Sequence, residues 1–330
     1  MKIVITGGNG YIGARLSLYL ANKKHDVIPL CFSSIPVDEN WKSKMFSILK
    51  ADIRQEETIA KIAALKPDVI IHLVSLDHHA SEKEPSIVNQ VNVLPTWQLL
   101  DACTKNGLKK FIYFSTIQVY GKLPNEIFDE TFPISTVNAY GLTHLLSEQI
   151  CEHYNRKTDT NVITIRLSNS YGNPIFYENN CWWLAINDLC RNAFINKEIR
   201  LLSDGTPQRD FIHGNDVCKA IDCLINYNEK QKNNIYHISS GETLTLLEIA
   251  QIIKQEFQIR YNQSLPIITP QGTVSEKAVN IPIEKYTISN NKIKTLGFSP
   301  DYSINKGVQE IFSYLERNVT LSGQCRLVKE

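Results

Sequence analysis

The sequence predicts an α/β protein with a doubly wound parallel sheet and a smaller mixed α/β domain. Short β-branched runs alternate with helix-like stretches in the first half of the chain; the runs are Ile3 to Thr6, Val27 to Cys31, Val69 to His72, Phe111 to Ser115 and Val162 to Leu167. Parallel strands need crossover connections, so this alternation favours helices on both faces of one sheet. After Leu167 the pattern becomes irregular and aromatic, which indicates the start of another structural unit.

Composition and charge exclude several classes of protein. The 35 basic and 34 acidic residues leave a net charge of +1 without a block of like charge, so we expect no nucleic acid and no membrane surface as partner. The chain begins directly in a strand and has no apolar run long enough to span a bilayer, so a cytoplasmic protein without a signal peptide is expected. The eight cysteines lack metal-ligand spacing, which predicts buried thiols and no metal.

A glycine-rich segment, GGNGYIG at residues 7–13, follows the first predicted strand and opens a helix. Glycines here allow a tight turn, close backbone approach to a pyrophosphate, and close packing of the helix on the strand. The helix N-terminus also presents free N–H groups and the positive end of its dipole to an anion. We therefore expect a nicotinamide dinucleotide to bind at this loop, through Gly7, Gly10, Tyr11, Ile12 and Gly13.

This loop and the strand pattern together predict a Rossmann-like domain and a separate substrate domain. Residues 1–170 and about 207–240 are assigned to the dinucleotide-binding domain, because a helix near 215–227 and a strand near 234–238 return to the sheet. Residues from about 171 to 206 and from 241 to 330 are assigned to the smaller substrate-binding domain.

The end of the second strand bears on which dinucleotide binds. An acidic side chain commonly holds the adenine ribose of NAD at this point. Here the strand ends in Cys31 and Phe32, followed by Ser33, and none of them carries a carboxylate. The Ser33 hydroxyl would not repel a 2′-phosphate, so NADP or NAD is expected, with a preference for NADP. Asp52 and Ile53, after the third strand, suit contacts with the adenine.

Several motifs resemble one enzyme family. Residues 114–121 (FSTIQVYG) are similar to the serine- or threonine-bearing strand of the extended short-chain dehydrogenase/reductase family that modifies nucleotide sugars. Residues 138–144 (NAYGLTH) resemble that family's Tyr-x-x-x-Lys helix, and similar pieces include Asn92 and residues 166–169, 205–213 and 296–300. Order and spacing match over nearly the whole chain, which implies an NAD(P)-dependent enzyme acting on a nucleotide sugar.

The resemblance also implies roles for individual residues. Tyr140 would exchange the proton of a sugar hydroxyl, which requires its pKa to move from about 10 towards neutrality, and Thr116 would hydrogen-bond the reacting oxygen. The remaining implied contacts are Asn92, Tyr140 and His144 to the cofactor, and Gln118, Asn169 and Arg209 to the substrate, Arg209 through the diphosphate. A homodimer through the helices at 84–105 and 140–155 is expected from the family.

His144 departs from the family pattern, which has lysine at this position. Residues 140 and 144 are one helical turn apart, so the imidazole faces the side of the tyrosine. A neutral imidazole can hydrogen-bond ribose hydroxyls but supplies no permanent positive charge at neutral pH. Three interpretations stay open: a working substitute for lysine, a remnant in a slow enzyme, and a protein that binds without turnover.

Residues 117 and 118 narrow the reaction type. In the resembling 4,6-dehydratases an acidic pair follows the threonine, and in epimerase-reductases a cysteine occupies the second position. Ile117 and Gln118 are neither acids nor bases, so dehydration and epimerisation at C3 or C5 are disfavoured. The prediction is hydride transfer at one carbon, C4, by a 4-ketoreductase. A 4-epimerase is the alternative, and a non-catalytic cofactor-binding regulatory or scaffold protein is an alternative of another class.

Two further segments allow two interpretations each, and one arginine expected from the family is missing. The loop at 75–79 (SLDHH) is either a solvated polar loop or the source of an extra acid or base beside the sugar. Trp182 and Trp183 either stack on a nucleotide base or pack the smaller domain. A late pyrophosphate-binding arginine is missing from the pattern, with only Lys277 nearby.

Overall fold

The β-branched runs of the first half form one seven-stranded parallel sheet in the computed structural model, which describes residues 1–274 and 284–321. The strand order is β11-β7-β5-β4-β1-β2-β3. The strands are β1 (Lys2–Thr6), β2 (Asp26–Cys31), β3 (Leu49–Lys50), β4 (Val69–His72), β5 (Lys110–Thr116), β7 (Asn161–Leu167) and β11 (Ile235–Ile238). Because β1 pairs with both β2 and β4, the winding direction reverses beside β1, where such sheets bind ligands.

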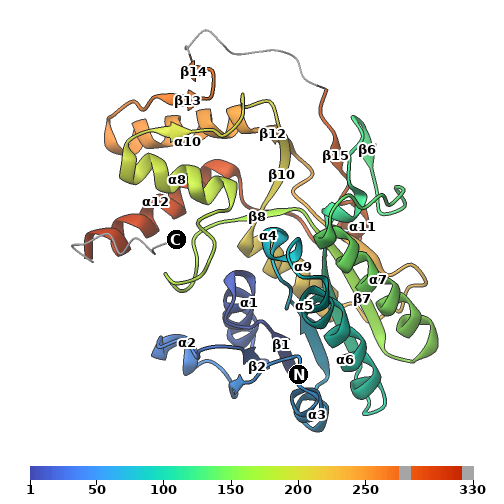
Figure 1. The fold of residues 1–330 in the computed structure, drawn as a ribbon. Helices are drawn as coiled ribbons and strands as arrows, with labels where there is room; N and C mark the ends of the chain where they lie inside the picture. The colour runs from blue at the N-terminus through green and yellow to red at the C-terminus, as the bar shows by residue number, and fades with distance from the viewer. Residues whose placement is uncertain (275–283, 322–330) are drawn as a thin grey trace.

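Helices cover both faces of this sheet (Figure 1). On one face lie α1 (Tyr11–Asn22) and α9 (Gly214–Asn226), and on the other α3 (Glu56–Ala64), α6 (Leu94–Thr104) and α7 (Ala139–Lys157). Successive strand side chains point to opposite faces, so Ile3 and Ile5 pack in one core and Val4 in the other. The predicted doubly wound fold is therefore confirmed.

A smaller mixed unit accompanies the large sheet. Its sheets contain β8 (Asn169–Tyr171), β10 (Gln208–His213) and β12 (Thr243–Thr245), and then β9 (Ile199–Arg200), β13 (Ile267–Thr269) and β14 (Gly272–Thr273). Helices α8 (Ala185–Asn196), α10 (Leu246–Tyr261) and α12 (Ile304–Leu321) surround its own apolar core. The domain boundaries stay a prediction; β10, which they assign to the larger domain, pairs here with β8 and β12.

Short elements complete the chain. They are α2 (Glu39–Lys42), α4 (His78–Ser81), α5 (Pro85–Val88), the π-helical turn η1 (Asn89–Val93), the 3-10 turn η2 (Ile117–Tyr120), α11 (Asn291–Lys294), and the strand pair β6 (Ile127–Phe128) and β15 (Thr287–Ile288). No helix in residues 1–274 and 284–321 is long and apolar enough to cross a membrane. Lys277, and Cys325 among the eight cysteines, lie outside the described residues.

Candidate active site

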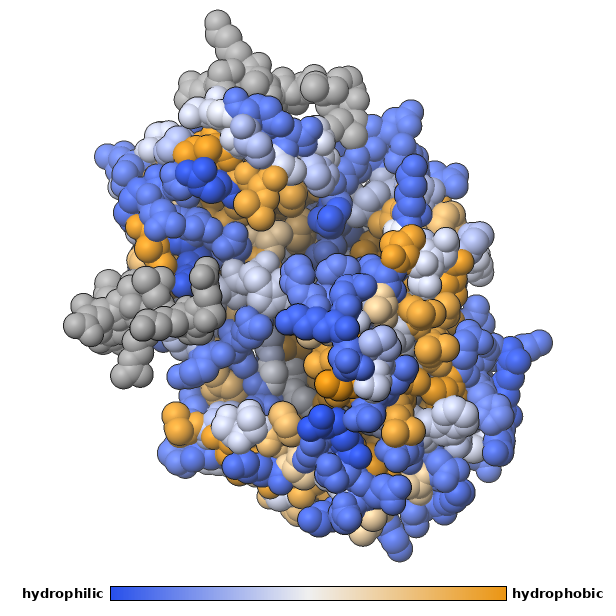
Figure 2. Space-filling model, viewed as in Figure 1, coloured by the Kyte–Doolittle hydropathy of each residue, from blue (hydrophilic) through white to orange (hydrophobic). Residues whose placement is uncertain are grey.

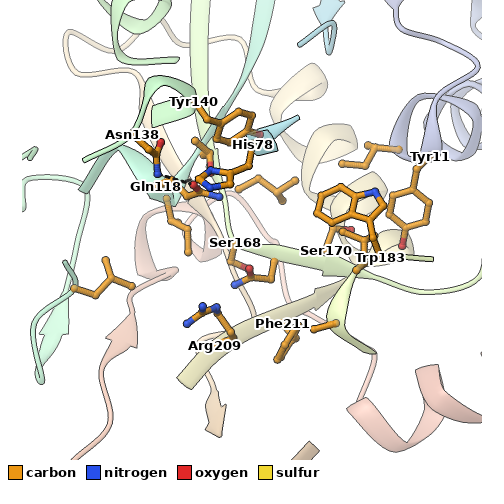
Figure 3. Close-up of a pocket in the computed structure, with 18 of the residues that line it drawn as sticks. Tyr11, His78, Gln118, Asn138, Tyr140, Ser168, Ser170, Trp183, Arg209 and Phe211 are labelled. Carbon is orange, nitrogen blue, oxygen red and sulfur yellow. Dashed lines mark hydrogen bonds between the residues drawn. The ribbon is translucent and has the colours of Figure 1, made fainter. Parts of the chain in front are cut away.

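A cleft of about 1020 Å³ opens at the carboxyl edge of the large sheet. One side consists of the loops that follow β1 and β4, the end of β5 and the beginning of α7. The other side comes from β8, β10 and residues 180–185 of the smaller unit (Figure 3). The cleft therefore lies where parallel α/β sheets place their ligands.

The glycine loop forms one end of the cleft and is fixed by close contacts. A Cβ atom on Gly13 would lie 2.1 Å from the carbonyl oxygen of Gly7, and one on Gly8 would lie 2.3 Å from Pro29. Gly10 caps α1 without a side-chain hydrogen bond, so the first turn of α1 is free to meet an anion. All five residues predicted to contact the cofactor here line the cleft: Gly7, Gly10, Tyr11, Ile12 and Gly13. This geometry fits the pyrophosphate of a dinucleotide.

The residues predicted for the adenosine end lie beyond the lining of this cleft. Ser33 is exposed just after β2, and Ile53 is buried in the core. Arg54 donates from Nε to Oδ1 of Asp52 at 3.0 Å and from Nη2 to Oδ2 at 2.6 Å, which lowers the pKa of Asp52. Arg54, which the sequence analysis missed, also lies 5.7 Å from the ring of Phe32, a side chain 62% exposed.

Tyr140 and Thr116 occupy the middle of the cleft. Thr116 ends β5, and Asn138 caps α7 by accepting a hydrogen bond from the Gly141 N–H at 2.7 Å, which sets Tyr140 in the first turn. A Cβ atom on Gly141 would lie 2.7 Å from the carbonyl oxygen of Gln118, so glycine lets α7 approach the end of β5. Burial, aided by the negative charge of Asp77, raises the pKa of Tyr140 to about 12. At neutral pH, Tyr140 is the protonated phenol.

His144 is buried behind Tyr140, with 3% of its surface exposed and its ring centroid 4.5 Å from that of Tyr140. Ser75 uses its one proton to donate to the carbonyl of Leu76 at 2.8 Å, so its oxygen accepts from His144 Nε2 at 3.2 Å. The other ring nitrogen, Nδ1, accepts from the Tyr113 hydroxyl at 2.8 Å. Burial lowers the pKa of His144 to about 4. His144 is thus a neutral imidazole, and it is not among the residues that line the cleft.

Comparison with known proteins identifies the family. Residues 3–239 match the NAD dependent epimerase/dehydratase family. The chain belongs to this family. It is therefore an enzyme of the short-chain dehydrogenase type, as the motifs implied, which favours the enzyme over the non-catalytic scaffold.

Relatives and solved structures of similar proteins span almost the whole chain. A putative UDP-glucose 4-epimerase of Methanocaldococcus jannaschii is 26% identical and aligns over 96% of this chain and 99% of its own length. A dTDP-glucose 4,6-dehydratase of Streptomyces niveus is 23% identical over 96% of this chain and 94% of its own. The structure of UDP-glucose 4-epimerase from Thermotoga maritima with UDP-glucose superposes with a TM-score of 0.81, at 23% identity, over 97% of this chain and 100% of that one.

Within this epimerase/dehydratase chain, Asn92 has a different setting from the one expected. It is buried in η1, where its side-chain oxygen accepts from the Leu76 N–H at 2.8 Å and its amide donates to Ser81 and Thr143. Asn92 therefore ties the loop after β4 to α7. It does not line the cleft, and its predicted contact with the cofactor stays a prediction.

The predicted substrate residues lie on the cleft wall. Asn169 donates to the carbonyl of Asp210 at 2.9 Å, and Arg209, the residue before Asp210 on β10, also lines the cleft (Figure 3). Gln118 also lines the cleft, and its side-chain oxygen accepts from the Asn138 amide at 3.2 Å. The two tryptophans differ: Trp183 lines the cleft and is 52% exposed, whereas Trp182 packs against Tyr177 and Tyr314.

A buried ion pair supports the end of β5 from behind. Arg166 on β7 and Glu148 on α7 are 2.7 Å apart and only 2% exposed, and Glu148 also accepts from Ser115. Breaking such a pair leaves an uncompensated buried charge, so the pair fixes α7 against β7, and the hydrogen bond from Ser115 ties α7 to β5. From the sequence, Arg166 could be recognised only as part of a motif, because its partner Glu148 is 18 residues away on another element.

Proposed function

We propose that this enzyme is an NAD(P)-dependent nucleotide-sugar oxidoreductase that transfers hydride at one sugar carbon, C4, as a 4-ketoreductase. The observation that carries this proposal is the position of Tyr140 in the cleft wall against the buried His144, with ring centroids 4.5 Å apart, where burial raises the pKa of Tyr140 to about 12 and lowers that of His144 to about 4. A ketone that accepts hydride also needs a proton on its oxygen, and a phenol is ready to donate one. Thr116, on the same wall, would hydrogen-bond that oxygen.

The cofactor would lie along the sheet edge from the glycine loop to Tyr140. The close-packed glycines and the uncapped start of α1 suit its pyrophosphate. When bound, its nicotinamide ring supplies or takes up the hydride. Tyr140 and Thr116 would hold the sugar oxygen, and Arg209 would bind the diphosphate as a bidentate donor. Trp183 offers an aromatic face at the cleft wall for the nucleotide base.

Ile117 and Gln118 support chemistry at a single carbon. Ile117 lines the cleft with an alkyl side chain, and the side-chain oxygen of Gln118 is engaged by Asn138. Neither group can move a proton at a carbon next to the ketone. This argues against a 4,6-dehydratase, although some relatives carry that name.

A 4-epimerase is the second candidate. It is favoured by the names of similar proteins, among them a UDP-glucuronic acid 4-epimerase from Bacillus cereus solved with NAD, at 21% identity and a TM-score of 0.78 over 96% of this chain and 97% of that one. An epimerase must return the same hydride, so it would retain its cofactor through purification. A reductase would release and exchange it.

The preference for NADP rests on the end of β2. Cys31 is buried there without a carboxylate nearby on the strand, and the Arg54 guanidinium lies over Phe32. Similar structures were solved with NAD, so NAD is the competing cofactor. Dissociation constants for NADPH and NADH, measured side by side for the wild type and Arg54→Gln, decide between them. Tighter binding of NADH to the wild type would contradict the preference.

A homodimer is proposed from apolar side chains on neighbouring helices. They are exposed on α5, α6 and α7, and comprise Ile87, Leu94, Trp97, Leu142 and Leu146. A second copy of this chain would cover them. Sedimentation should give a dimer that Leu146→Glu dissociates. Ile259→Glu, a change at an exposed isoleucine on α10, is the control that should leave the dimer intact.

The test of the proposed reaction uses UDP- and dTDP-linked 4-keto sugars with NADPH or NADH. Reduction to the 4-hydroxy sugar is expected, and turnover in deuterated water should leave the protons at C3 and C5 unexchanged. Interconversion of UDP-glucose and UDP-galactose without added cofactor would instead establish the 4-epimerase. Deuterium at C3 or C5 would contradict single-carbon chemistry.

A further inference from the structure

His78 lies beside Tyr140 at the cleft wall (Figure 3). The two rings meet edge to face, with centroids 6.4 Å apart and planes at 74°. The Nδ1 atom of His78 is buried and has no hydrogen-bond partner among the described residues. Buried imidazole nitrogens usually have partners, so an unpaired one in a cleft requires an explanation.

The position of His78 is built into the fold. Just before it, the Leu76 N–H donates to Asn92, which in turn donates to Thr143 of α7 at 3.0 Å. Just after it, the Glu82 carboxylate accepts from the Ala139 N–H, the first residue of α7, at 2.7 Å. The segment that carries His78 is thus tied to α7 on both sides, close to Tyr140. Side chains held in this way need no rearrangement to act together.

The other ionisable groups around Tyr140 are poorly suited to exchange its proton. His144 has both ring nitrogens engaged by Ser75 and Tyr113. The Asp77 carboxylate caps α4 by accepting from the Ala80 N–H at 2.8 Å, and Glu82 is engaged by α7. His79 is exposed and contacts the His78 ring, with centroids 5.6 Å apart. His79 also lines the cleft, but the ring that contacts Tyr140 and carries a buried nitrogen without a partner is that of His78.

We propose that His78 is the proton-relay partner of Tyr140, which takes the place of the charge that lysine supplies in the family. The inference rests on the proposed function. In oxidation, the sugar C–H bond breaks and its hydrogen and electron pair go to the nicotinamide dinucleotide. The hydroxyl proton moves to the Tyr140 oxygen as the Tyr140 proton moves to the imidazole of His78, which becomes imidazolium. Reduction runs these transfers backwards, and the imidazolium returns its proton to solvent after oxidation.

This relay explains how a tyrosine without a neighbouring cation can still act in both directions. The phenol never has to exist as a free phenolate, because its proton leaves as the substrate proton arrives. Imidazole has two ring nitrogens, of which one can accept a proton while the other carries one, so it suits this exchange. His78 therefore acts on the reaction through Tyr140.

The first experiment compares His78→Asn with the wild type, using the substrate on which the wild type turns over and its cofactor. General acid–base catalysis contributes roughly 10²–10⁴-fold, so kcat should fall by about 100-fold with KM and cofactor affinity within about twofold. The pH dependence of kcat should lose one limb. Imidazole added to His78→Ala should restore activity in proportion to its concentration. His153→Asn, which removes an exposed histidine from α7, should change none of these values.

Three outcomes would overturn the relay. The first is a kcat for His78→Asn within threefold of the wild type. The second is a lower kcat that added imidazole does not restore in His78→Ala and whose pH dependence keeps both limbs in His78→Asn, and the third is loss of the pH limb of kcat in His79→Asn instead of His78→Asn. Titration of the His78 ring by NMR in ligand-free protein separates this inference from the proposed function. Tyr140→Phe should move the His78 midpoint even if no nucleotide sugar is turned over, and an unchanged midpoint overturns the pairing.

Discussion

The two ends of the cleft follow different rules. In the glycine loop, Gly8 and Gly13 cannot be replaced by a larger residue. An added Cβ atom would collide with Pro29 at Gly8 and with the backbone of Gly7 at Gly13. At the catalytic end, His144 stands where the family has lysine, and it is accommodated by hydrogen bonds from Tyr113 and to Ser75. At Gly8 and Gly13 no larger side chain can replace glycine, because there is no space for a Cβ atom. At position 144 the lysine can be replaced, because a neighbouring residue can take over its role in proton transfer.

The steric part of the comparison is tested by substitutions in the glycine loop. Gly13→Ala places a Cβ atom 2.1 Å from the Gly7 oxygen, so cofactor binding measured by calorimetry should fall by more than about 100-fold, as strain of about 3 kcal/mol requires. Gly10→Ala meets the same oxygen at 3.2 Å and should cost less. An equal loss of cofactor affinity in Gly13→Ala and Gly10→Ala would contradict the claim that steric contact with the Gly7 oxygen decides binding.

Removing the Tyr140 hydroxyl tests the catalytic end. Tyr140→Phe should lower kcat roughly 10³-fold, the size of a general acid–base contribution, while cofactor affinity stays within about twofold. Tyr227→Phe is the control. It removes a hydroxyl near the amino edge of the sheet, where Lys110 binds the Tyr227 carbonyl, and should leave kcat and cofactor affinity unchanged. If Tyr140→Phe keeps its activity, the proton comes from another group.

Acid should destabilise the protein through its buried neutral histidine at the catalytic end. The folded pKa of His144, about 4, lies below the ordinary value of 6.5. The unfolded chain thus binds more protons between these pH values, so stability is complete above pH 6.5 and is lost as pH falls towards 4. The difference of 2.5 units corresponds to about 3 kcal/mol. Urea unfolding at pH 7 and pH 4.5 should show a smaller acid loss in His144→Gln than in the wild type. An equal loss would mean that His144 is not buried neutral.

A smaller effect is expected when the family residue is restored. His144→Lys places a cation near Tyr140, which lowers the pKa of the phenol. Oxidation at neutral pH should become faster, because the Tyr140 proton leaves more easily, and reduction should change less because it uses the protonated form. A loss of activity with intact cofactor binding would indicate that Tyr113, Ser75 and His144 form a unit that lysine cannot replace.

The fold and the glycine loop could be predicted because their signals are local. The β-branched runs predicted the sheet, and GGNGYIG predicted a turn in which the contact that restricts Gly13, with the Gly7 oxygen, lies within the same seven residues. Thr116 and Tyr140 could likewise be placed on the wall of one cleft from motifs. The environment of His144 could not be predicted, because Ser75 and Tyr113 are 69 and 31 residues away.

Other parts of the site depended on the same kind of long-range contact. Arg54 was missed because its stacking on Phe32 joins the ends of two strands. The different settings of Trp182 and Trp183 follow from Tyr177 and Tyr314, one of them far along the chain. The repeated histidines in the loop after β4 were a visible signal, but their relation to Tyr140 required the ties through Asn92 and Glu82.

The tautomer and charge of His144 test the central claim most directly. Selective ¹⁵N labelling of histidine, with His144→Gln used for assignment, reports both by NMR in the ligand-free protein. The account predicts a neutral ring with its proton on Nε2 from pH 8 down to about pH 5, since its pKa is about 4 and Tyr113 occupies Nδ1. An imidazolium at neutral pH would contradict the account. His144 would then supply the positive charge of the family's lysine, whereas the account holds that His144 is neutral.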